Sequence, residues 1–474
     1  MKLRSLIFVY FLFLISFLNF SITLKSQDIN NKYLLGNIET GNISLEIAFS
    51  ISLESEKFET KMYVPEQFIY AMEAESYYHN DSLRLNVNKL KAEFNGVWID
   101  SINSYQGTWH QGQQYYPTVL KSVEKNEVSF IERPQTPQPP FPYIEKEICV
   151  ENTKGASVLC GTLTLPDEDN DYPLVILITG SGAQDRNEEI AGHQPFKVIA
   201  NHLTKCGYAV FRYDDRGYAK SKGDLGNSTS YDFMTDAAAI VKFFGDYPNI
   251  NSDNIGIIGH SEGAMIAMML AAKYPKDIAY IISLAGPAIS ISKLMIKQTE
   301  DINRAAGIAE EDIQWISKMT DKAFDIALKS KNQTEMRKGI VKLYKEYSED
   351  LSPEQIEEFG LNQAGINSSV MQMSSEWMKY FLAFEPSKYL KKIKCPVLAL
   401  NGTKDIQVNY IQNIEGFQNS INHKKCPLLE VNAIESLNHL FQYAETGTVQ
   451  EYYYITETFS PLALDIIEEF IKKQ

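Results

Sequence analysis

Six short apolar segments, separated by stretches with helical spacing, constrain the fold of residues 144–474 more than any other feature of the sequence. They read PLVILITG, AVFRYDDRG, IGIIGHS, AYIISLAG, PVLALNG and PLLEVNA. Continuous apolar runs that end in glycine or polar residues suit strands buried on both faces. The intervening QPFKVIANHLTKC, DFMTDAAAIVKFF and AMIAMMLAAKY have apolar residues at helical spacing. The alternation predicts an α/β fold with a mostly parallel sheet covered by helices, preceded by a hairpin from EICVEN and SVLCGTLTLP.

One interval breaks this alternation. Residues 287–388 separate the fourth and fifth apolar runs and carry several helical patterns, such as EEDIQWISKMTDKAFDIALK and TEMRKGIVKLYKEY. A connection of this size is a subdomain rather than a loop. We expect it to cap the carboxyl ends of the strands, where α/β sheets bind ligands. Its aromatic residues Trp377, Phe381 and Phe384 could line a pocket there, but their helical spacing favours packing between helices.

The sequence before this region has a different character. Residues 28–132 alternate polar and apolar side chains in runs such as NISLEIAFSIS and SLRLNVNKLKAEF, which predicts a small all-β domain. Its aromatic residues could stack on sugar rings, but filling a small β core is the favoured interpretation for Trp98, Trp109, Tyr115 and Tyr116. Residues 133–143, RPQTPQPPFPY, follow as a stiff proline-rich linker.

The first 26 residues have the layout of a secretory signal peptide. Lys2 and Arg4 precede an almost wholly apolar run from Leu6 to Phe20, and SITLKSQ follows shortly after it. We expect cleavage after Ser26 and export to the periplasm or beyond. The alternative is an uncleaved membrane anchor, because the apolar run is nearly long enough to span a bilayer. The net charge of −15 argues against nucleic-acid binding, since phosphate binding needs a basic surface.

A five-residue stretch, GHSEG at 259–263, fits the pattern G-x-S-x-G. It follows the apolar run IGIIG and precedes an Ala/Met-rich helical pattern, which is the context of a serine on a sharp strand-to-helix turn. Glycines are required on both sides because a side chain there would collide with the neighbouring strand and helix. The pattern alone could arise by chance, but in this context it predicts Ser261 as a nucleophile.

A nucleophilic serine needs a base, and the base needs an acid that orients it. On a turn of this kind the three residues follow in the order Ser, acid, His. His439, in SLNHLFQ, follows the last apolar run and is the predicted base, whereas His423 lies in a lysine-rich stretch before that run. Asp405 comes directly after PVLALNG and is the predicted acid, with Glu435 as the runner-up.

An oxyanion hole needs two backbone donors. The N–H of Glu262, directly after the nucleophile, is one. The loop ITGSGAQDR supplies the other, for which the N–H of Ser181 is favoured over that of Gly182. The side chain of Glu262 should turn away from the oxyanion, and we expect an ion pair with Arg186 or Arg216 to hold it.

The chemistry predicted for this serine requires no cofactor or metal. The sequence has no CxxC or HxxxH spacing for a structural zinc site and no GxxxxGK[ST] phosphate loop.

Five cysteines are too sparse for a disulfide framework. Cys149 and Cys160 flank a predicted hairpin turn and could pair, but isolated thiols are the favoured interpretation. Of the other histidines, His193 is interpreted as a loop residue, and His260 is expected to pack or hydrogen-bond locally.

Together, LITGSGAQDRNE, HQPF, FRYDDRG, GHSEG, PVLALNGTKDIQV and LNHLFQ resemble the bacterial secreted α/β-hydrolases related to EstD-type esterases and to serine-aminopeptidase-like hydrolases. The resemblance covers about residues 133–474, and some members also carry an N-terminal β domain and a proline-rich linker. It implies the α/β-hydrolase fold, with an eight-stranded mostly parallel sheet and a helical cap, and the triad Ser261, Asp405 and His439. One departure is Ala219, where the family pattern DDRGxGxS has its second glycine; this alters a loop near the pocket and leaves the triad intact.

The resemblance implies hydrolysis of a small-molecule or saccharide carboxylic ester through an acyl-enzyme. A serine peptidase of the same fold is the alternative, and Glu310, Glu311 and Glu376 of the cap are candidates to bind a substrate ammonium group. A further alternative is a non-catalytic carbohydrate-binding protein that uses the β domain, against which the complete triad argues.

Overall fold

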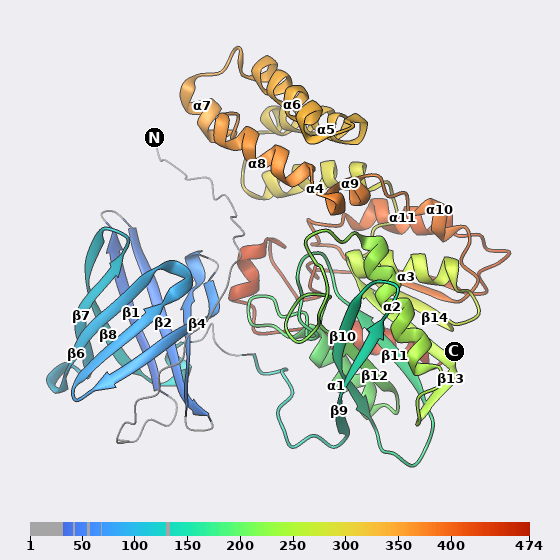
Figure 1. Ribbon diagram of the computed structural model, residues 1–474, viewed down its shortest axis with the longest axis horizontal. Helices are drawn as coiled ribbons and strands as arrows, with labels where there is room; N and C mark the ends of the chain where they lie inside the picture. The colour runs from blue at the N-terminus through green and yellow to red at the C-terminus, as the bar shows by residue number, and fades with distance from the viewer. Residues whose placement is uncertain (1–31, 41–42, 55–56, 68, 129–132) are drawn as a thin grey trace. The chain divides into compact units, whose positions relative to one another are not determined.

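The computed structural model describes residues 32–40, 43–54, 57–67, 69–128 and 133–474 (Figure 1). The predicted signal segment, residues 1–26, lies outside them. None of the helices in these described ranges is both long and apolar enough to cross a membrane. The chain divides into two compact units. One comprises the described residues before 129 together with 348–362, and the other comprises 133–347 and 363–474.

The N-terminal part folds into a closed antiparallel barrel, drawn in blue in Figure 1. Its strands are β1 (Lys32–Thr40), β2 (Ile43–Glu54), β3 (Lys57–Val64), β4 (Ile69–His79), β5 (Ser82–Val87), β6 (Ala92–Ile99), β7 (Ser104–Gln111) and β8 (Gln114–Val123). Each strand pairs with the next, and β1 also pairs with β8, which leaves no free sheet edge. In β5 the residues Leu83, Leu85 and Val87 are buried and alternate with more exposed ones. The alternating pattern thus predicted an all-β domain correctly.

The aromatic residues of the barrel mostly fill its core. Trp109 is 1% exposed, and its ring centroid lies 6.3 Å from that of Phe49. Trp98 and Tyr116 are partly buried against the same apolar cluster. Tyr115 is different: it is 68% exposed, and its ring stacks on His110 with 4.4 Å between the centroids. Packing therefore accounts for the first three, while Tyr115 lies at the surface.

The second unit is built on a mixed sheet of eight strands. They are β9 (Ile144–Asn152), β10 (Ser157–Leu165), β11 (Tyr172–Ile178), β12 (Ala209–Tyr213), β13 (Ile250–His260), β14 (Tyr280–Leu284), β15 (Val397–Gly402) and β16 (Leu429–Ile434). Their order across the sheet is β16-β15-β14-β13-β11-β12-β10-β9. The strands from β11 onward pair in parallel, whereas β9 and β10 form an antiparallel hairpin joined antiparallel to β12. The predicted eight-stranded, mostly parallel sheet with a leading hairpin is confirmed.

Helices cover both faces of this sheet. One layer contains α2 (Ser230–Phe244), α3 (Glu262–Lys273) and α11 (Tyr410–Ser420), and the other contains α1 (Pro195–Lys205) and α12 (Pro461–Ile471). Within β11, Leu174, Ile176 and Ile178 pack in the first apolar cluster, while Val175 and Leu177 pack in the second. Because alternate side chains are buried on opposite faces, the strand reads as one continuous apolar run.

Helices also fill the chain between β14 and β15, which confirms the predicted insertion. They are α4 (Ile291–Ala305), α5 (Glu310–Lys329), α6 (Gln333–Ser348), α7 (Pro353–Glu358), α8 (Gln363–Met373), α9 (Glu376–Leu382) and α10 (Ser387–Leu390). Helix α9 begins after Ser375, whose hydroxyl accepts the backbone N–H of Met378 at 3.1 Å. This cap fixes the start of the short helix that carries Trp377 and Phe381.

The predicted linker, residues 133–143, contacts the second unit at its start. Gln135 accepts the backbone N–H of Phe459 with Oε1 at 2.9 Å and donates to the Phe459 carbonyl through Nε2 at 2.9 Å. Arg133 donates to the carbonyls of Ala191 and Tyr453. The first residues of the segment are therefore held by the second unit.

Cys149 and Cys160 form a disulfide between β9 and β10. The favoured prediction of isolated thiols was wrong for this pair, because the antiparallel register places the two residues directly opposite each other. Cys206, Cys395 and Cys426 are free thiols.

Candidate active site

Ser261 lies on a strained turn between β13 and α3. Its backbone has φ 52° and ψ −115°, in the left-handed half of φ space that few non-glycine residues adopt. A Cβ at Gly259 would lie 2.2 Å from the carbonyl of Gly263, and one at Gly263 would lie 2.1 Å from the carbonyl of Ile178. The two glycines are therefore required by contact distance, as the sequence pattern indicated. Strain of this kind is typical of residues whose position is set by function.

The structure brings Asp405 and His439 together. Asp405 follows β15 and His439 follows β16, and His439 Nδ1 lies 2.8 Å from Asp405 Oδ2. The other carboxylate oxygen of Asp405 accepts the backbone N–H groups of Gln407 and Val408, both at 2.8 Å. Both side chains are almost fully buried. This arrangement fixes the imidazole ring and leaves its Nε2 as the atom available to a substrate or a nucleophile.

Ser261 and His439 line one cavity of about 320 Å³. Its polar part is formed by Ser181 and Gln407, from loops that follow the strands, and by Glu262, the first residue of α3. Its apolar part comes from helices of the insertion, with Leu294 and Met295 on α4 and Trp377, Met378 and Phe381 on α9. The insertion thus covers the carboxyl ends of the strands, where a cap was expected.

The aromatic residues of the cap divide into two groups. Trp377 and Phe381 line the cavity and stack on each other with 4.9 Å between ring centroids. Phe384 does not line the cavity and is buried in the apolar cluster of the sheet, to which Phe381 also belongs. The favoured packing is therefore present, but Trp377 and Phe381 also border the cavity, because spacing along a helix does not reveal whether the buried side also faces a void.

The predicted oxyanion donors also lie at this cavity. Both Ser181 and Glu262 contribute to its lining, whereas Gly182 lines a smaller neighbouring void. The N–H of Gly180 is already committed, because it donates to Glu188 Oε1 at 2.7 Å. The backbone N–H groups of Glu262 and Ser181 therefore remain the two predicted donors of the oxyanion hole.

The side chain of Glu262 does not pair with arginine, which corrects the expectation from sequence. Its Oε1 accepts the hydroxyl of Ser230 at 2.5 Å and the indole N–H of Trp377 at 2.9 Å. Arg186 instead pairs with Asp214, and Arg216 pairs with Asp236. Burial raises the pKa of Glu262, and the hydroxyl and indole donors oppose that effect.

A second buried carboxyl lies behind the same loop. Asp215 accepts the hydroxyl of Thr179 at 2.8 Å and the backbone N–H of Gln184 at 2.9 Å. Burial, with added repulsion from Glu262 and Glu188, holds its pKa well above the usual range. The two aspartates of the motif FRYDDRG therefore have different roles. Asp214 forms an ion pair, and Asp215 holds the loop after β11.

Sequence reasoning missed Glu188 and the role of His260. Glu188 is 1% exposed, and its Oε1 lies 2.8 Å from His260 Nδ1. His193 is also buried rather than a surface loop residue: its ring nitrogens contact the Thr458 hydroxyl at 3.0 Å and the Tyr452 carbonyl at 2.7 Å. His423 is exposed, as expected for a lysine-rich stretch. The signal for Glu188 was its place in an acidic loop after the first parallel strand, but nothing in the sequence gave its partner.

The cap glutamates lie away from the cavity. Glu310 pairs with Arg304 and Glu376 pairs with Lys379, and both acids are exposed, as is Glu311. In the described part of the chain, none of these three contributes to the lining of the Ser261 cavity. The structure thus does not single out any of them as a site for a substrate ammonium group.

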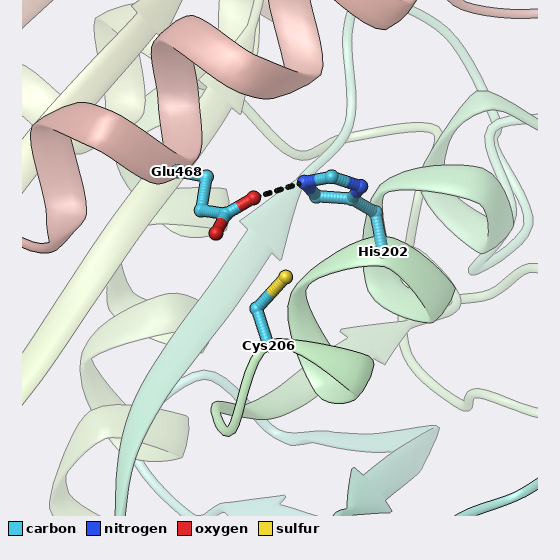
Figure 2. Close-up of side chains that lie close together, drawn as sticks. All are labelled: His202, Cys206 and Glu468. Carbon is cyan, nitrogen blue, oxygen red and sulfur yellow. Dashed lines mark hydrogen bonds and ion pairs between the residues drawn. The ribbon is translucent and has the colours of Figure 1, made fainter.

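One cluster outside the site could offer ligands to a cation. His202, Cys206 and Glu468 each present one ligand atom, all within 4.8 Å of one another (Figure 2). However, His202 Nε2 already bonds Glu468 Oε2 at 2.8 Å, and Lys472 forms an ion pair with the same carboxylate. Burial and the hydrogen bond with Glu468 raise the pKa of Cys206 to about 11, so the thiol is protonated in the absence of a metal. The cluster is satisfied by protons and a lysine, and we assign it no metal.

Three features define an α/β-hydrolase fold. They are a serine on a sharp strand-to-helix turn, a paired Asp and His after later strands of the sheet, and a helical cap over the sheet. Residues 173–443 match the family model described as the alpha/beta hydrolase fold, and the chain belongs to this family. Among curated proteins, esterase EstD of Thermotoga maritima is 26% identical over 183 residues. That match spans 38% of this chain and 43% of EstD, so less than half of the relative is covered.

The solved structures that match this chain include an esterase and a proline iminopeptidase. The Pyrococcus furiosus esterase Pf2001 is 18% identical with a TM-score of 0.43, and the match covers 72% of this chain and 97% of that one. Proline iminopeptidase from Mycobacterium smegmatis is 16% identical with a TM-score of 0.41, covering 69% and 98%.

Proposed function

We propose that this protein is a serine hydrolase that cleaves carboxylic esters by way of an acyl-enzyme. The observation that carries the proposal is the 2.8 Å contact between Asp405 Oδ2 and Nδ1 of His439, which lines the same cavity as Ser261. The similarity to a protein named as an esterase supports ester bonds over other acyl bonds.

Each residue has a separate role in the proposed reaction. Ser261 Oγ attacks the acyl carbonyl while His439 Nε2 takes its proton, and Asp405 stabilises the imidazolium. The N–H groups of Glu262 and Ser181 stabilise the oxyanion. His439 then returns the proton to the leaving alcohol, and water releases the acid in a second step of the same form.

The test uses p-nitrophenyl esters of graded acyl length, together with acetylated sugars. We expect Ser261→Ala to lower kcat by about 10⁴-fold or more. Ser252→Ala, at the exposed start of the same strand, is the matched control and should keep full activity. A fluorophosphonate should label the native protein and the control but not Ser261→Ala. Full activity of Ser261→Ala would overturn the assignment of the nucleophile.

Amino-acid anilides separate the esterase from a peptidase of the same mechanism. The cavity wall formed by Leu294, Met295, Trp377, Met378 and Phe381 suits an apolar acyl group. We therefore expect ester hydrolysis without appreciable anilide hydrolysis. If anilides were cleaved more efficiently than esters, the peptidase alternative would replace the present proposal.

We also propose that the chain is exported, with residues 1–26 removed. The sequence layout of that segment supports this, and so does the Cys149–Cys160 disulfide, since disulfides persist in oxidising compartments. N-terminal sequencing of protein recovered outside the cytoplasm should begin at Gln27. Recovery of the intact chain from the cytoplasmic fraction would overturn the proposal.

A further inference from the structure

Three segments of the active site meet at one buried imidazole. His260, the residue before the proposed nucleophile, is 5% exposed. Its Nδ1 lies 2.8 Å from Glu188 Oε1, and its Nε2 lies 2.9 Å from the backbone carbonyl oxygen of His439. Glu188 Oε1 also accepts the N–H of Gly180 at 2.7 Å. The loop after β11, the turn at Ser261 and the loop that carries the catalytic base are therefore joined through Glu188 and His260.

The hydrogen-bond partners determine how many protons this pair holds. A carbonyl oxygen only accepts, so Nε2 of His260 must carry a proton for the bond to His439. A second proton must lie between Nδ1 and Oε1, because an unprotonated nitrogen facing a carboxylate would be repelled. The pair is then neutral overall and holds one proton more than an ionised glutamate beside a neutral histidine. Burial lowers the pKa of His260, but the charge and hydrogen bond of Glu188 and the His439 carbonyl outweigh it, so the pKa is raised.

The local backbone is built around this pair. Glu188 has φ 53°, a conformation that costs a non-glycine residue about 1 kcal/mol or more and persists where surrounding contacts fix it. Gly180 leaves room for the pair, since a Cβ at that position would lie 3.2 Å from Glu188 Oε1. A strained backbone and a nearly fully buried carboxyl group at the same residue are a cost that simple packing would avoid.

We propose that Glu188 and His260 are positioning residues, which hold the oxyanion loop and the backbone of His439 in the geometry needed for attack by Ser261. The inference rests on the proposed esterase function for its kinetic consequences. Both residues also border the Ser261 cavity, and Glu188 Oε1 and both ring nitrogens of His260 are engaged in the bonds that join the three segments. Gly180 directly precedes the predicted oxyanion donor Ser181, and the held carbonyl belongs to the base itself, so the pair fixes both parts of the site relative to the nucleophile.

Loss of the extra proton breaks the link. A neutral imidazole has one N–H, so His260 must then give up either Glu188 or the His439 carbonyl. The charged and titratable groups that face His260 are Glu188 from the loop after β11, the His439 ring at 4.7 Å between centroids, and Asp405 from the loop after β15. Of these, Glu188 and Asp405 both favour the protonated pair. Activity should therefore fall at alkaline pH through a group other than the triad.

The decisive variant is Glu188→Gln, which keeps the size of the side chain and removes its charge. We expect kcat to fall on the order of 100-fold, as for a small misplacement of reacting groups, with KM changed less than about threefold. The alkaline limb of kcat should move to lower pH, because the group that raises the pKa of His260 is gone. Glu189→Gln, at the exposed neighbouring residue of the same loop, is the matched control and should leave both the rate and the pH profile unchanged.

A double variant tests whether the two residues act as one unit. His260→Phe combined with Glu188→Gln should lose no more activity than the worse single variant, since either change breaks the same link. Wild-type kcat and an unmoved alkaline limb in Glu188→Gln, with Ser261→Ala inactive, would overturn the inference.

Nitrogen-15 NMR of the histidine rings gives a readout that does not depend on activity. With His260→Phe used for assignment, His260 should show both ring nitrogens protonated at neutral pH in the wild type and one in Glu188→Gln. If the wild type hydrolysed no ester, the proposed function would fail, while the NMR result would still decide whether the pair exists. A singly protonated His260 that is unchanged by Glu188→Gln would overturn the pair itself.

Discussion

Trp377 of the cap helix α9 donates its indole N–H at 2.9 Å to Glu262, the residue that follows the proposed nucleophile. The same carboxylate oxygen accepts the hydroxyl of Ser230, the first residue of α2. Glu262 is 2% exposed, so these two hydrogen bonds connect α9 of the cap with α3 and α2 in the protein interior. The cap is therefore tied to the chemistry by a polar bond as well as by apolar packing.

Removing this bond should affect substrate binding more than the chemical step. We expect Trp377→Phe to raise KM about fivefold or more, which corresponds to the loss of one hydrogen bond to a buried acid. Trp315→Phe on α5 changes the same residue type elsewhere in the cap and should leave KM unaltered. Steady-state kinetics on a p-nitrophenyl ester check this, and equal KM values for both variants would contradict it.

Replacing the acid of the triad should alter the tautomer of the base. In Asp405→Asn, the amide oxygen can still accept the N–H groups of Gln407 and Val408, which leaves the amide nitrogen facing His439 Nδ1. The ring proton would then move to Nε2, the wrong nitrogen for a base, and kcat should fall by about 10⁴-fold. Glu435→Gln, at the runner-up acid, should stay active. Comparable losses in the two variants would contradict the assignment of Asp405.

Buried His193 predicts a loss of stability in acid. Burial and the charge of Arg133 lower its pKa from 6.5 to about 3, so below pH 6.5 the unfolded chain takes up a proton that the folded chain refuses. The contribution of neutral, buried His193 to the unfolding free energy is fully present above pH 6.5 and is lost as the pH falls towards 3. Between pH 7 and pH 4, the wild type should lose about 3 kcal/mol more unfolding free energy than His193→Gln.

Urea unfolding at a series of pH values measures this difference. His423→Gln, at an exposed histidine, is the control and should follow the wild-type curve. Parallel curves for the wild type and His193→Gln would show that His193 titrates normally.

The Cys149–Cys160 bridge should add stability that a reductant removes. The two residues are 11 positions apart, and closing a loop of that length stabilises a fold by about 2–3 kcal/mol in the chain-entropy model. The double variant Cys149→Ser/Cys160→Ser should lose that amount and become insensitive to dithiothreitol, whereas Cys206→Ser should not. Thiol titration of the denatured, unreduced protein should find the three free cysteines, and a count of five would disprove the bridge.

Much of the fold and the order of the three proposed catalytic residues could be predicted from local sequence. The strand at Tyr172–Ile178 is apolar throughout because both of its faces are buried, and that property is visible in seven residues. Ser261 was recognisable because its turn demands glycines at 259 and 263, where a side chain would collide with backbone. Asp405 and His439 were placed by their positions after the last two strands, and the structure brings them within hydrogen-bond distance.

The predictions that were wrong concern which side chains come into contact in the folded chain. Glu262 was expected to pair with an arginine, but Ser230 and Trp377 reach it first. Trp377 follows Glu262 by 115 positions, and no local pattern encodes that contact. The pairing of Cys149 with Cys160 depended on the exact register of one hairpin, which a shift of one residue would have abolished.

The sequence by itself determined which segments are strands and helices, where the sharp turn falls, and which serine, aspartate and histidine could act in order. These properties depend on the periodicity of apolar residues and on the steric demands of glycine, both of which are local. Only the tertiary structure decided that Glu188 reaches His260 and that Glu262 binds the cap. A buried polar group bonds whichever partner the packed fold brings within about 3 Å, and that distance is set by all the intervening elements together.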